Sequence, residues 1–362
     1  MKIINIVGAR PNFIKIAPIM RQMKKSSVIK PVLLHTGQHY DIEMSKRFFQ
    51  ELDIPSPDIS LEVGSDSHAK QVARIMERFD TVCDEQKPDA ILVVGDVNST
   101  MACSLVAAKK GIRIIHVEAG IRSYDREMPE EINRLVTDSL ADLLLPPSKD
   151  AVENLLREGH SIKQIHMVGN IMIDTLMESQ PRIRKSEIIK TLGIEEKKYA
   201  LVTLHRPSNV DNPEAFKRIL LAFAKIQNRV PIVFPVHPRT RKMLENPDLM
   251  EVTSRMPNLV LCDPLGYFDF GKLVQACRMV ITDSGGIQEE STVYGIPCIT
   301  IRENTERPVT IWEGTNELAG TDTAKIIDCA ERIMDGKWKT GQIPELWDGH
   351  TAERIISWIE KL

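Results

Sequence analysis

The 362-residue sequence predicts an α/β protein built from two doubly wound domains, each a buried parallel sheet with helices on both faces. Three observations predict this class. Short apolar runs alternate with longer segments of helical period along nearly the whole chain. The runs are continuously apolar, as strands buried on both faces are. The alternation is interrupted once, over residues 180–198, and the chain is long enough for two domains.

The first half of the chain predicts a domain at residues 1–180. Its expected strands are Ile3–Val7, Val32–His35, Ala90–Val94, Ile114–Val117 and His166–Val168. Helical periodicity between them predicts helices at Phe13–Met23, Ala69–Gln86 and Thr100–Lys109. Strands separated by helices favour a parallel sheet, because parallel neighbours need a long crossover connection.

The second half predicts a domain at residues 181–350, after charged residues and Pro181 interrupt the pattern over Gln180–Lys198. The last segment, Ala352–Leu362, has the period of an amphipathic helix. We expect this helix, at residues 351–362, to pack back on the first domain and complete it. The expected strands of the second domain are Tyr199–Leu204, Ile232–Val236, Leu259–Leu261, Met279–Thr282 and Cys298–Ile301.

Composition excludes several classes of protein. With 47 Lys and Arg against 50 Asp and Glu, the net charge is -3 and no basic run stands out, which argues against a nucleic-acid partner. Six cysteines without a C-x-x-C pair are typical of reduced thiols in a cytoplasmic protein, and no metal-ligand spacing is present. The apolar amino-terminal run is too short for a signal peptide or a membrane span. We therefore expect a cytoplasmic protein without a metal or a membrane partner.

Polar clusters follow the predicted strands in both halves. Because parallel strands present their carboxyl ends at one edge of a sheet, two facing sheets would collect these clusters around a central cleft. The clusters of the first half are Gly8–Asn12, Gly95–Thr100 and Glu118–Gly120. Those of the second half are His205–Pro207, His237–Arg239 and Asp283–Gly286.

The segment Asp283–Glu290 is a candidate phosphate site. It follows a strand and opens a helix, and its two glycines let backbone N–H groups approach an anion. Glu290 can accept hydrogen bonds from ribose, whereas a plain helix cap is the simpler interpretation. Arg10, also at a helix start, suits a diphosphate if it is more than a surface arginine. The absence of G-x-G-x-x-G argues against NAD.

Carboxylates gather on the other side of the expected cleft. Asp96 and Glu118 follow neighbouring strands, so we expect each to raise the pKa of the other, as general acid–base chemistry requires. Glu130 and Glu131 add to the cluster, although a helix cap or surface charge also explains such acids. His205 can donate a proton to a leaving diphosphate. His116 shares a strand face with Glu118 if the strand continues that far, and a core histidine is equally consistent with its position.

The motifs occur together in a characteristic order, and they resemble those of the non-hydrolysing UDP-N-acetylglucosamine 2-epimerases over nearly the whole chain. The resemblance implies the GT-B fold, in which two Rossmann-like domains face a central cleft, and a homodimer without a cofactor. The motifs are Gly8–Pro11, Gly95–Asp96, His116–Gly120, Pro129–Arg134, His205–Arg206, Asp283–Glu290 and Thr305–Pro308.

The implied reaction interconverts UDP-N-acetylglucosamine and UDP-N-acetylmannosamine for polysaccharide precursors. UDP is eliminated across C1–C2 to give 2-acetamidoglucal, and is then added back after a proton returns to the other face of C2. By matching position the resemblance implies the catalytic residues Asp96, Glu118, Glu130 and His205, without assigning each acid to a face. The UDP-binding residues are Arg10, His237, Phe270, Ser284, Gly285, Gly286 and Glu290, and further binding candidates are Lys15, Arg134, Arg206 and Arg307.

Other activities stay open from the sequence. A 2-epimerase of a modified UDP-sugar, of the diacetamido-uronate type, has similar motifs, and so does a hydrolysing epimerase that releases N-acetylmannosamine. A GT-B glycosyltransferase would need an acceptor but not Asp96 and Glu118 together. A non-catalytic nucleotide-sugar sensor would bind UDP tightly without turnover.

Overall fold

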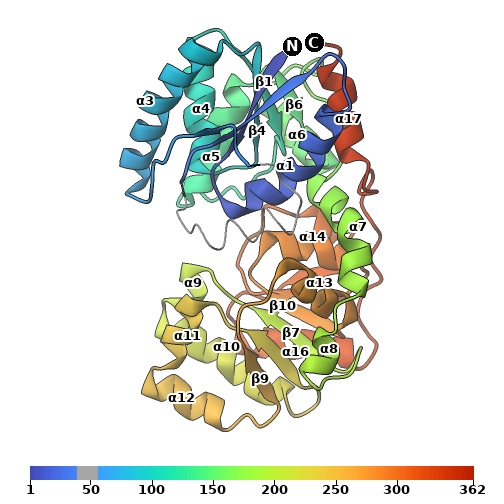
Figure 1. Ribbon diagram of the computed structural model, residues 1–362. Coiled ribbons are helices and arrows are strands. Elements are labelled where there is room, and N and C mark those ends of the chain that lie inside the picture. Colours follow the sequence, from blue (N-terminus) through green and yellow to red (C-terminus); the bar gives the residue numbers. More distant parts are fainter. Residues whose placement is uncertain (39–55) are drawn as a thin grey trace. The chain divides into compact units, whose positions relative to one another are not determined.

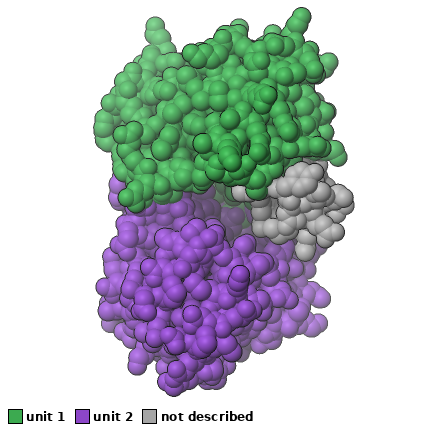
Figure 2. Space-filling view, turned by 90° about the vertical axis from the view of Figure 1, so that its left-hand side faces the viewer, with its two compact units in different colours: residues 1–177, 345–362 green, residues 178–344 purple. Residues whose placement is uncertain are grey.

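The computed structural model describes residues 1–38 and 56–362, which form two parallel six-stranded sheets enclosed by helices (Figure 1). Residues 1–177 and 345–362 make up one compact unit, here unit 1, and residues 178–344 make up unit 2 (Figure 2). In this part of the chain, no helix combines the length and the apolar character needed to cross a membrane.

The sheet of unit 1 has the strand order β3-β2-β1-β4-β5-β6. All five residues of β4 are buried, so this apolar run is covered by helices on both faces, as the sequence pattern predicts. In chain order the strands are β1 (Lys2–Val7), β2 (Lys30–His35), β3 (Ile59–Ser60), β4 (Ala90–Val94), β5 (Arg113–Val117) and β6 (Leu143–Leu145).

Helices cover both faces of this sheet. The carboxyl-terminal helix α17 packs against α1 of the same unit, and α4 packs between α3 and α5 (Figure 1). The helices of unit 1 are α1 (Arg10–Met23), α3 (His68–Gln86), α4 (Asn98–Lys109), α5 (Pro129–Leu140), α6 (Lys149–Arg157) and α17 (Thr351–Ile359), and α7 (Ile171–Arg184) contains the boundary between the units.

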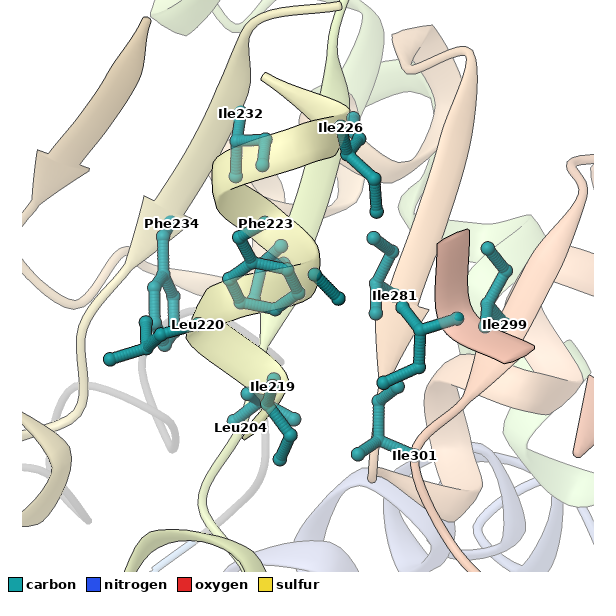
Figure 3. Packing of buried hydrophobic residues seen from close by; sticks show 14 of the residues in the cluster. Leu204, Ile219, Leu220, Phe223, Ile226, Ile232, Phe234, Ile281, Ile299 and Ile301 are labelled. Carbon is teal, nitrogen blue, oxygen red and sulfur yellow. The ribbon is translucent and has the colours of Figure 1, made fainter. Parts of the chain in front are cut away.

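The sheet of unit 2 repeats this topology, with the order β12-β11-β10-β7-β8-β9. Its core includes Phe223 and Phe234, which meet edge to face between α10 and β8 (Figure 3). The strands are β7 (Ala200–Thr203), β8 (Ile232–Pro235), β9 (Leu259–Cys262), β10 (Met279–Thr282), β11 (Cys298–Thr300) and β12 (Asn316–Leu318).

Local sequence signals start the helices of unit 2. The Asn212 side chain accepts hydrogen bonds from the N–H groups of Glu214 and Ala215, and Pro213 begins α10, so cap and proline together fix its start. The helices are α8 (Ile188–Thr191), α9 (Pro207–Val210), α10 (Pro213–Ile226), α11 (Pro238–Leu244), α12 (Pro247–Ser254), α13 (Tyr267–Ala276), α14 (Gly285–Val293), α15 (Val309–Trp312) and α16 (Thr323–Met334).

Most predicted elements are confirmed within a few residues, but the strand predicted at His166–Val168 is wrong. The residue before that segment, Ile165, forms an isolated bridge with Leu144, and the last strand is β6. The predicted interruption also starts too early, since α7 continues through Pro181 to Arg184. The short strands β3 and β12 carry too few residues for a periodic signal.

Candidate active site

Each sheet reverses its strand order between two neighbouring strands, β1 and β4 in unit 1 and β7 and β10 in unit 2. Ligands of open α/β sheets bind where the loops leave such a pair of strands in opposite directions. The loops after these four strands carry Gly8–Asn12, Gly95–Asp96, His205–Arg206 and Asp283–Gly286. The topology therefore places most of the predicted site residues at the binding edge of their own sheet.

The first two loops of unit 1 are tied together by Asn12. Its Oδ1 accepts the N–H groups of Gly8 at 3.2 Å and Ala9 at 3.0 Å, and its Nδ2 donates to the Val94 carbonyl at 2.8 Å. Gly8 is required for close approach, since a Cβ there would lie 2.1 Å from Ser99 Oγ. Arg10 begins α1, and its side chain lies outside the described part of the structure.

Glu118 is a buried carboxylate with its own cation. Its Oε2 lies 2.5 Å from Lys15 Nζ, and the two side chains are 3% and 9% exposed. The ammonium group compensates the buried charge, which would otherwise be expensive. Glu118 also has φ +67, a left-handed conformation that non-glycine residues rarely adopt. β5 ends one residue earlier, so Glu118 turns out of the strand, and the expectation that it shares a strand face with His116 is wrong.

Asp96 is paired in a similar way by α5. Arg134 donates to Asp96 Oδ2 from Nε at 2.9 Å, and Asn133 Nδ2 donates to the Asp96 carbonyl at 2.9 Å. A Cβ placed on Gly95 would lie 3.1 Å from Lys15 Nζ and 3.4 Å from Glu118 Oε2. The Glu118–Lys15 pair thus lies against the backbone that carries Asp96, and each acid faces a separate cation.

The other two acids lie in the first turn of α5 and have different surroundings. Glu131 is buried and accepts hydrogen bonds from the N–H groups of Ser123 and Tyr124, besides its ion pair with Arg134. Glu130 is half-buried and has no hydrogen-bond or ion-pair partner among the described residues. Of the two, Glu130 is the one whose carboxylate is available to a ligand.

In unit 2 a buried aspartate orients His205. Asp283 Oδ1 lies 3.0 Å from His205 Nδ1, and Asp283 Oδ2 accepts the N–H groups of His205 at 3.0 Å and Arg206 at 2.9 Å. Burial raises the pKa of Asp283, but these hydrogen bonds outweigh it and hold the pKa below its usual value. The imidazole is 48% exposed. The carboxylate therefore fixes Nδ1 and leaves Nε2 as the nitrogen that can meet a ligand.

The start of α14 has the geometry that binds an anion at a helix amino terminus. Ser284 is the N-cap residue, and Gly285 and Gly286 form the first turn. A Cβ on Gly285 would lie 3.0 Å from Glu306 Oε1, so a carboxylate sits beside this turn. Glu306 is paired with Arg302 at 2.7 Å and with Arg206 at 3.4 Å. The helix start therefore already stabilises one negative charge, the Glu306 carboxylate, which also faces the guanidinium groups of Arg302 and Arg206.

Further along α14 lie two adjacent buried acids. Glu289 forms an ion pair with Arg307, one of the predicted binding candidates. Glu290 is also buried, and burial together with the neighbouring Glu289 raises its pKa to about 8. Glu290 is therefore mostly protonated at neutral pH, and its carboxyl group can donate a hydrogen bond as well as accept one.

The two remaining candidates of unit 2 lie at helix starts. His237 is exposed and caps α11, where its Nδ1 accepts the N–H of Arg239 at 3.3 Å. Phe270, on α13, is half-buried and packs against the apolar cluster between that helix and the sheet. The described residues include no group of three His, Cys, Asp or Glu side chains arranged to hold a metal ion.

Sequence reasoning missed two buried aspartates that support the site, Asp283 as the partner of His205 and Asp138 behind the loops of unit 1. The position of Asp283 directly after a predicted strand indicates a place at the binding edge of the sheet. Its pairing with His205 depends on which strands are neighbours in the sheet, and the sequence does not give that order. Asp138 lies in the last turn of α5, where an acid gives no signal of a buried role.

Comparison with known proteins decides the family. The family model described as UDP-N-acetylglucosamine 2-epimerase matches residues 21–360. The chain belongs to this family. A protein from Methanococcus maripaludis named UDP-N-acetylglucosamine 2-epimerase homolog is 44% identical to it, over 91% of each chain.

Two further proteins match along the whole chain. The crystal structure of the Methanocaldococcus jannaschii UDP-GlcNAc 2-epimerase with UDP-GlcNAc and UDP is 38% identical, with a TM-score of 0.90 and full coverage of both chains. A UDP-2,3-diacetamido-2,3-dideoxy-D-glucuronate 2-epimerase from Pseudomonas aeruginosa is 36% identical, also over all of both chains. The two sheets and the similarity to the Methanocaldococcus jannaschii structure confirm the predicted GT-B fold of two Rossmann-like domains.

Proposed function

We propose that this protein interconverts UDP-N-acetylglucosamine and UDP-N-acetylmannosamine without hydrolysing them. The observation that carries the proposal is the Glu118 carboxylate, buried against Lys15 beside the loop of Asp96. A carbon acid such as C2 of the sugar needs a positioned base on each face in turn, and each of these two acids has its own cation. Family membership supports the same reaction.

The proposed reaction removes and returns one proton at C2. A carboxylate takes the C2 proton as the C1–O bond to UDP breaks, which leaves 2-acetamidoglucal and UDP. A proton then returns to the opposite face of C2 as UDP adds back to C1. Asp96, Glu118 and Glu130 are the candidates for these transfers, and the proposal needs no cofactor. His205, oriented by Asp283, stabilises the leaving diphosphate.

UDP binding is proposed for unit 2. Free N–H groups at the start of α14 would face the diphosphate, and protonated Glu290 would hydrogen-bond the ribose. Phe270 would stack on uracil, with His237 and Arg10 as further contacts. Since Lys15, Arg134, Arg206 and Arg307 already face carboxylates, we propose that they hold the charges of the site in place.

We further propose that the protein works in the cytoplasm as a homodimer and supplies polysaccharide precursors. All six cysteines are free thiols, which supports a reducing compartment. The dimer and the pathway rest on the resemblance to the family.

Proton NMR of the purified protein with UDP-N-acetylglucosamine in heavy water tests the reaction. We expect UDP-N-acetylmannosamine to appear with deuterium at C2 and without free sugar. An unchanged spectrum would contradict the proposal, and the same assay with a diacetamido-uronate UDP-sugar would then examine the substrate of the Pseudomonas aeruginosa relative. Accumulation of free N-acetylmannosamine would instead indicate a hydrolysing enzyme.

A further inference from the structure

Behind the acid loops of unit 1 lie three buried polar side chains, His116, Asp138 and Arg122, and Arg122 reaches from them to the exposed Glu158. His116 Nδ1 is 2.6 Å from Asp138 Oδ1, and Asp138 Oδ2 is 2.6 Å from Arg122 Nη2. Arg122 in turn makes two hydrogen bonds to Glu158, at 2.8 and 2.6 Å. The side chains of His116, Asp138 and Arg122 are at most 1% exposed.

The hydrogen bonds of His116 fix its protonation. Its Nδ1 faces the Asp138 carboxylate, and its Nε2 lies 2.9 Å from the Gly95 carbonyl oxygen. A carbonyl oxygen only accepts, so Nε2 carries a proton. Burial raises the pKa of Asp138, but His116 and Arg122 outweigh it and hold the pKa below its usual value, so the carboxylate is ionised and Nδ1 is also a donor. Both ring nitrogens of His116 therefore face hydrogen-bond acceptors.

The group around His116 pairs opposite charges. Asp138, from α5, lies against both His116 and Arg122, and Arg122, from the loop after β5, also faces Glu158 at the end of α6. The strand residues paired with His116, Val93 and Leu144, are apolar. The buried carboxylate of Asp138 thus has two partners, and Arg122 links it to the solvent-exposed Glu158.

The same group holds the backbone of both acid loops. His116 donates to the carbonyl of Gly95, the residue before Asp96. Asp138 Oδ2 accepts the N–H of Gly120 at 3.0 Å, two residues after Glu118. Asn133 and Arg134 come from the same helix as Asp138 and bond Asp96 directly. One helix, α5, thereby fixes the loop of Asp96 and the left-handed turn that carries Glu118.

We propose that His116, held through both ring nitrogens by Asp138 and the Gly95 carbonyl, and Asp138 are positioning residues that set the relative placement of the Asp96 and Glu118 carboxylates. Neither side chain needs to contact the substrate. The inference rests on the proposed function, in which Asp96 and Glu118 transfer protons at C2. Loss of the His116–Asp138 pair shifts the Asp96 and Glu118 carboxylates by up to about 1 Å. This shift lowers the rate of the chemical step and leaves substrate binding nearly intact.

The first test reads the protonation of His116 without any substrate. The probe is the ring-nitrogen spectrum of protein labelled with ¹⁵N-histidine at pH 8, with His116 assigned by the signals that disappear in His116→Gln. We expect both ring nitrogens to carry a proton, because each faces a hydrogen-bond acceptor. A signal from an unprotonated ring nitrogen of His116 would overturn the proposal. Should His116→Gln fail to fold, the signals displaced in Asp138→Asn give the assignment.

The second test separates positioning from stability. His116→Gln and Asp138→Asn are expected to lower kcat about 10- to 100-fold while KM changes less than about threefold. Asp174→Asn is the matched control, since Asp174 is a buried aspartate of unit 1 whose carboxylate accepts the N–H groups of Thr351 and Ala352 at the start of α17. It should lose stability and keep its kcat. An equal loss of kcat in all three variants, or wild-type kcat in His116→Gln, would overturn the proposal.

Wild-type turnover, measured first in the same buffer, separates this inference from the proposed function. An inactive wild-type protein would contradict the epimerase reaction itself. An active wild-type enzyme whose kcat survives the loss of His116 would contradict only the positioning role.

Discussion

At the scale of single residues, the behaviour of each carboxylate in the site follows from the group that faces it. Glu118 faces Lys15 and Asp96 faces Arg134, so each of these acids has its own cation. Glu290 is buried beside another acid, and its pKa rises to about 8. These different surroundings suit the different tasks of the proposed function, proton transfer for the acids of unit 1 and hydrogen bonding for Glu290.

Glu118→Gln is predicted to remove turnover and to leave UDP binding intact. The amide cannot take a proton, so the epimerisation rate should fall at least about a hundredfold, whereas Glu118 is not one of the proposed UDP contacts. Rate measurements and calorimetric titration with UDP check both parts. Glu127→Gln, at an exposed position of the same loop, is the matched control and should be fully active. A parallel loss of UDP affinity in Glu118→Gln would argue against a catalytic role.

Glu290 predicts a pH dependence of stability. An acid whose pKa is higher in the folded state destabilises the fold once it ionises. This cost is absent below its ordinary value of 4.5, and grows to its full size as the pH rises through about 8. The free energy of unfolding should fall over this window by roughly 5 kcal/mol.

Urea unfolding of wild type and Glu290→Gln at several pH values measures this contribution. The difference between the two proteins should grow from pH 5 to pH 8.5, with Glu290→Gln the more stable at the upper end. Glu331→Gln, exposed on α16 of the same unit, should follow wild type. A difference independent of pH would show that Glu290 ionises normally in the fold.

At the scale of elements, the loops after the strands depend on close backbone contacts. Gly120 has φ +78, and a Cβ there would lie 2.2 Å from the Ala151 carbonyl oxygen on α6. Asn154, on the same helix, donates to the Gly120 carbonyl at 2.9 Å. The loop that carries Glu118 is therefore held against α6 by contacts that leave no room for a side chain.

Gly120→Ala is predicted to destabilise unit 1 strongly, by about 3 kcal/mol or more, because left-handed strain and a clash with backbone add together. Gly111→Ala is the matched control. Gly111 has φ +68 but open space around its Cβ position, so only the conformational cost of about 1 kcal/mol remains. Equal losses in urea unfolding would mean that α6 moves aside without cost.

Prediction of the elements succeeded where the pattern was long and apolar, as for β4 and α3. It failed at β6, because three leucines before two prolines are too short to show a period. It also ended α7 too early at Pro181, a residue that breaks isolated helices but is tolerated here inside one. Tertiary packing decided both cases.

At the scale of the whole molecule, two sheets of the same strand order divide the proposed reaction between them. Unit 1 carries the acids, and unit 2 carries His205 and the start of α14. In the proposed function the acids of unit 1 act on the sugar, and the groups of unit 2 bind UDP.

Hydrogen exchange with two related ligands tests this division. UDP alone should slow exchange in the loops after β7 and β10. UDP-N-acetylglucosamine should in addition slow exchange in the loops after β4 and β5, because its sugar reaches the acids. Uridine, which lacks the diphosphate, is the control and should protect neither pair of loops. If the complete UDP-sugar protected only unit 2, a role of the unit 1 acids in the reaction would be contradicted.

The sequence by itself determined the fold class, most of the elements and the family, because apolar runs and ordered motifs are properties of neighbouring residues. It also named the acids and His205. The tertiary structure alone decided the partners: Lys15 for Glu118, Asp283 for His205, and Asp138 for His116. These pairs are 103, 78 and 22 residues apart. The physical reason is that charge and protonation depend on distance in space, which the order of strands in each sheet sets.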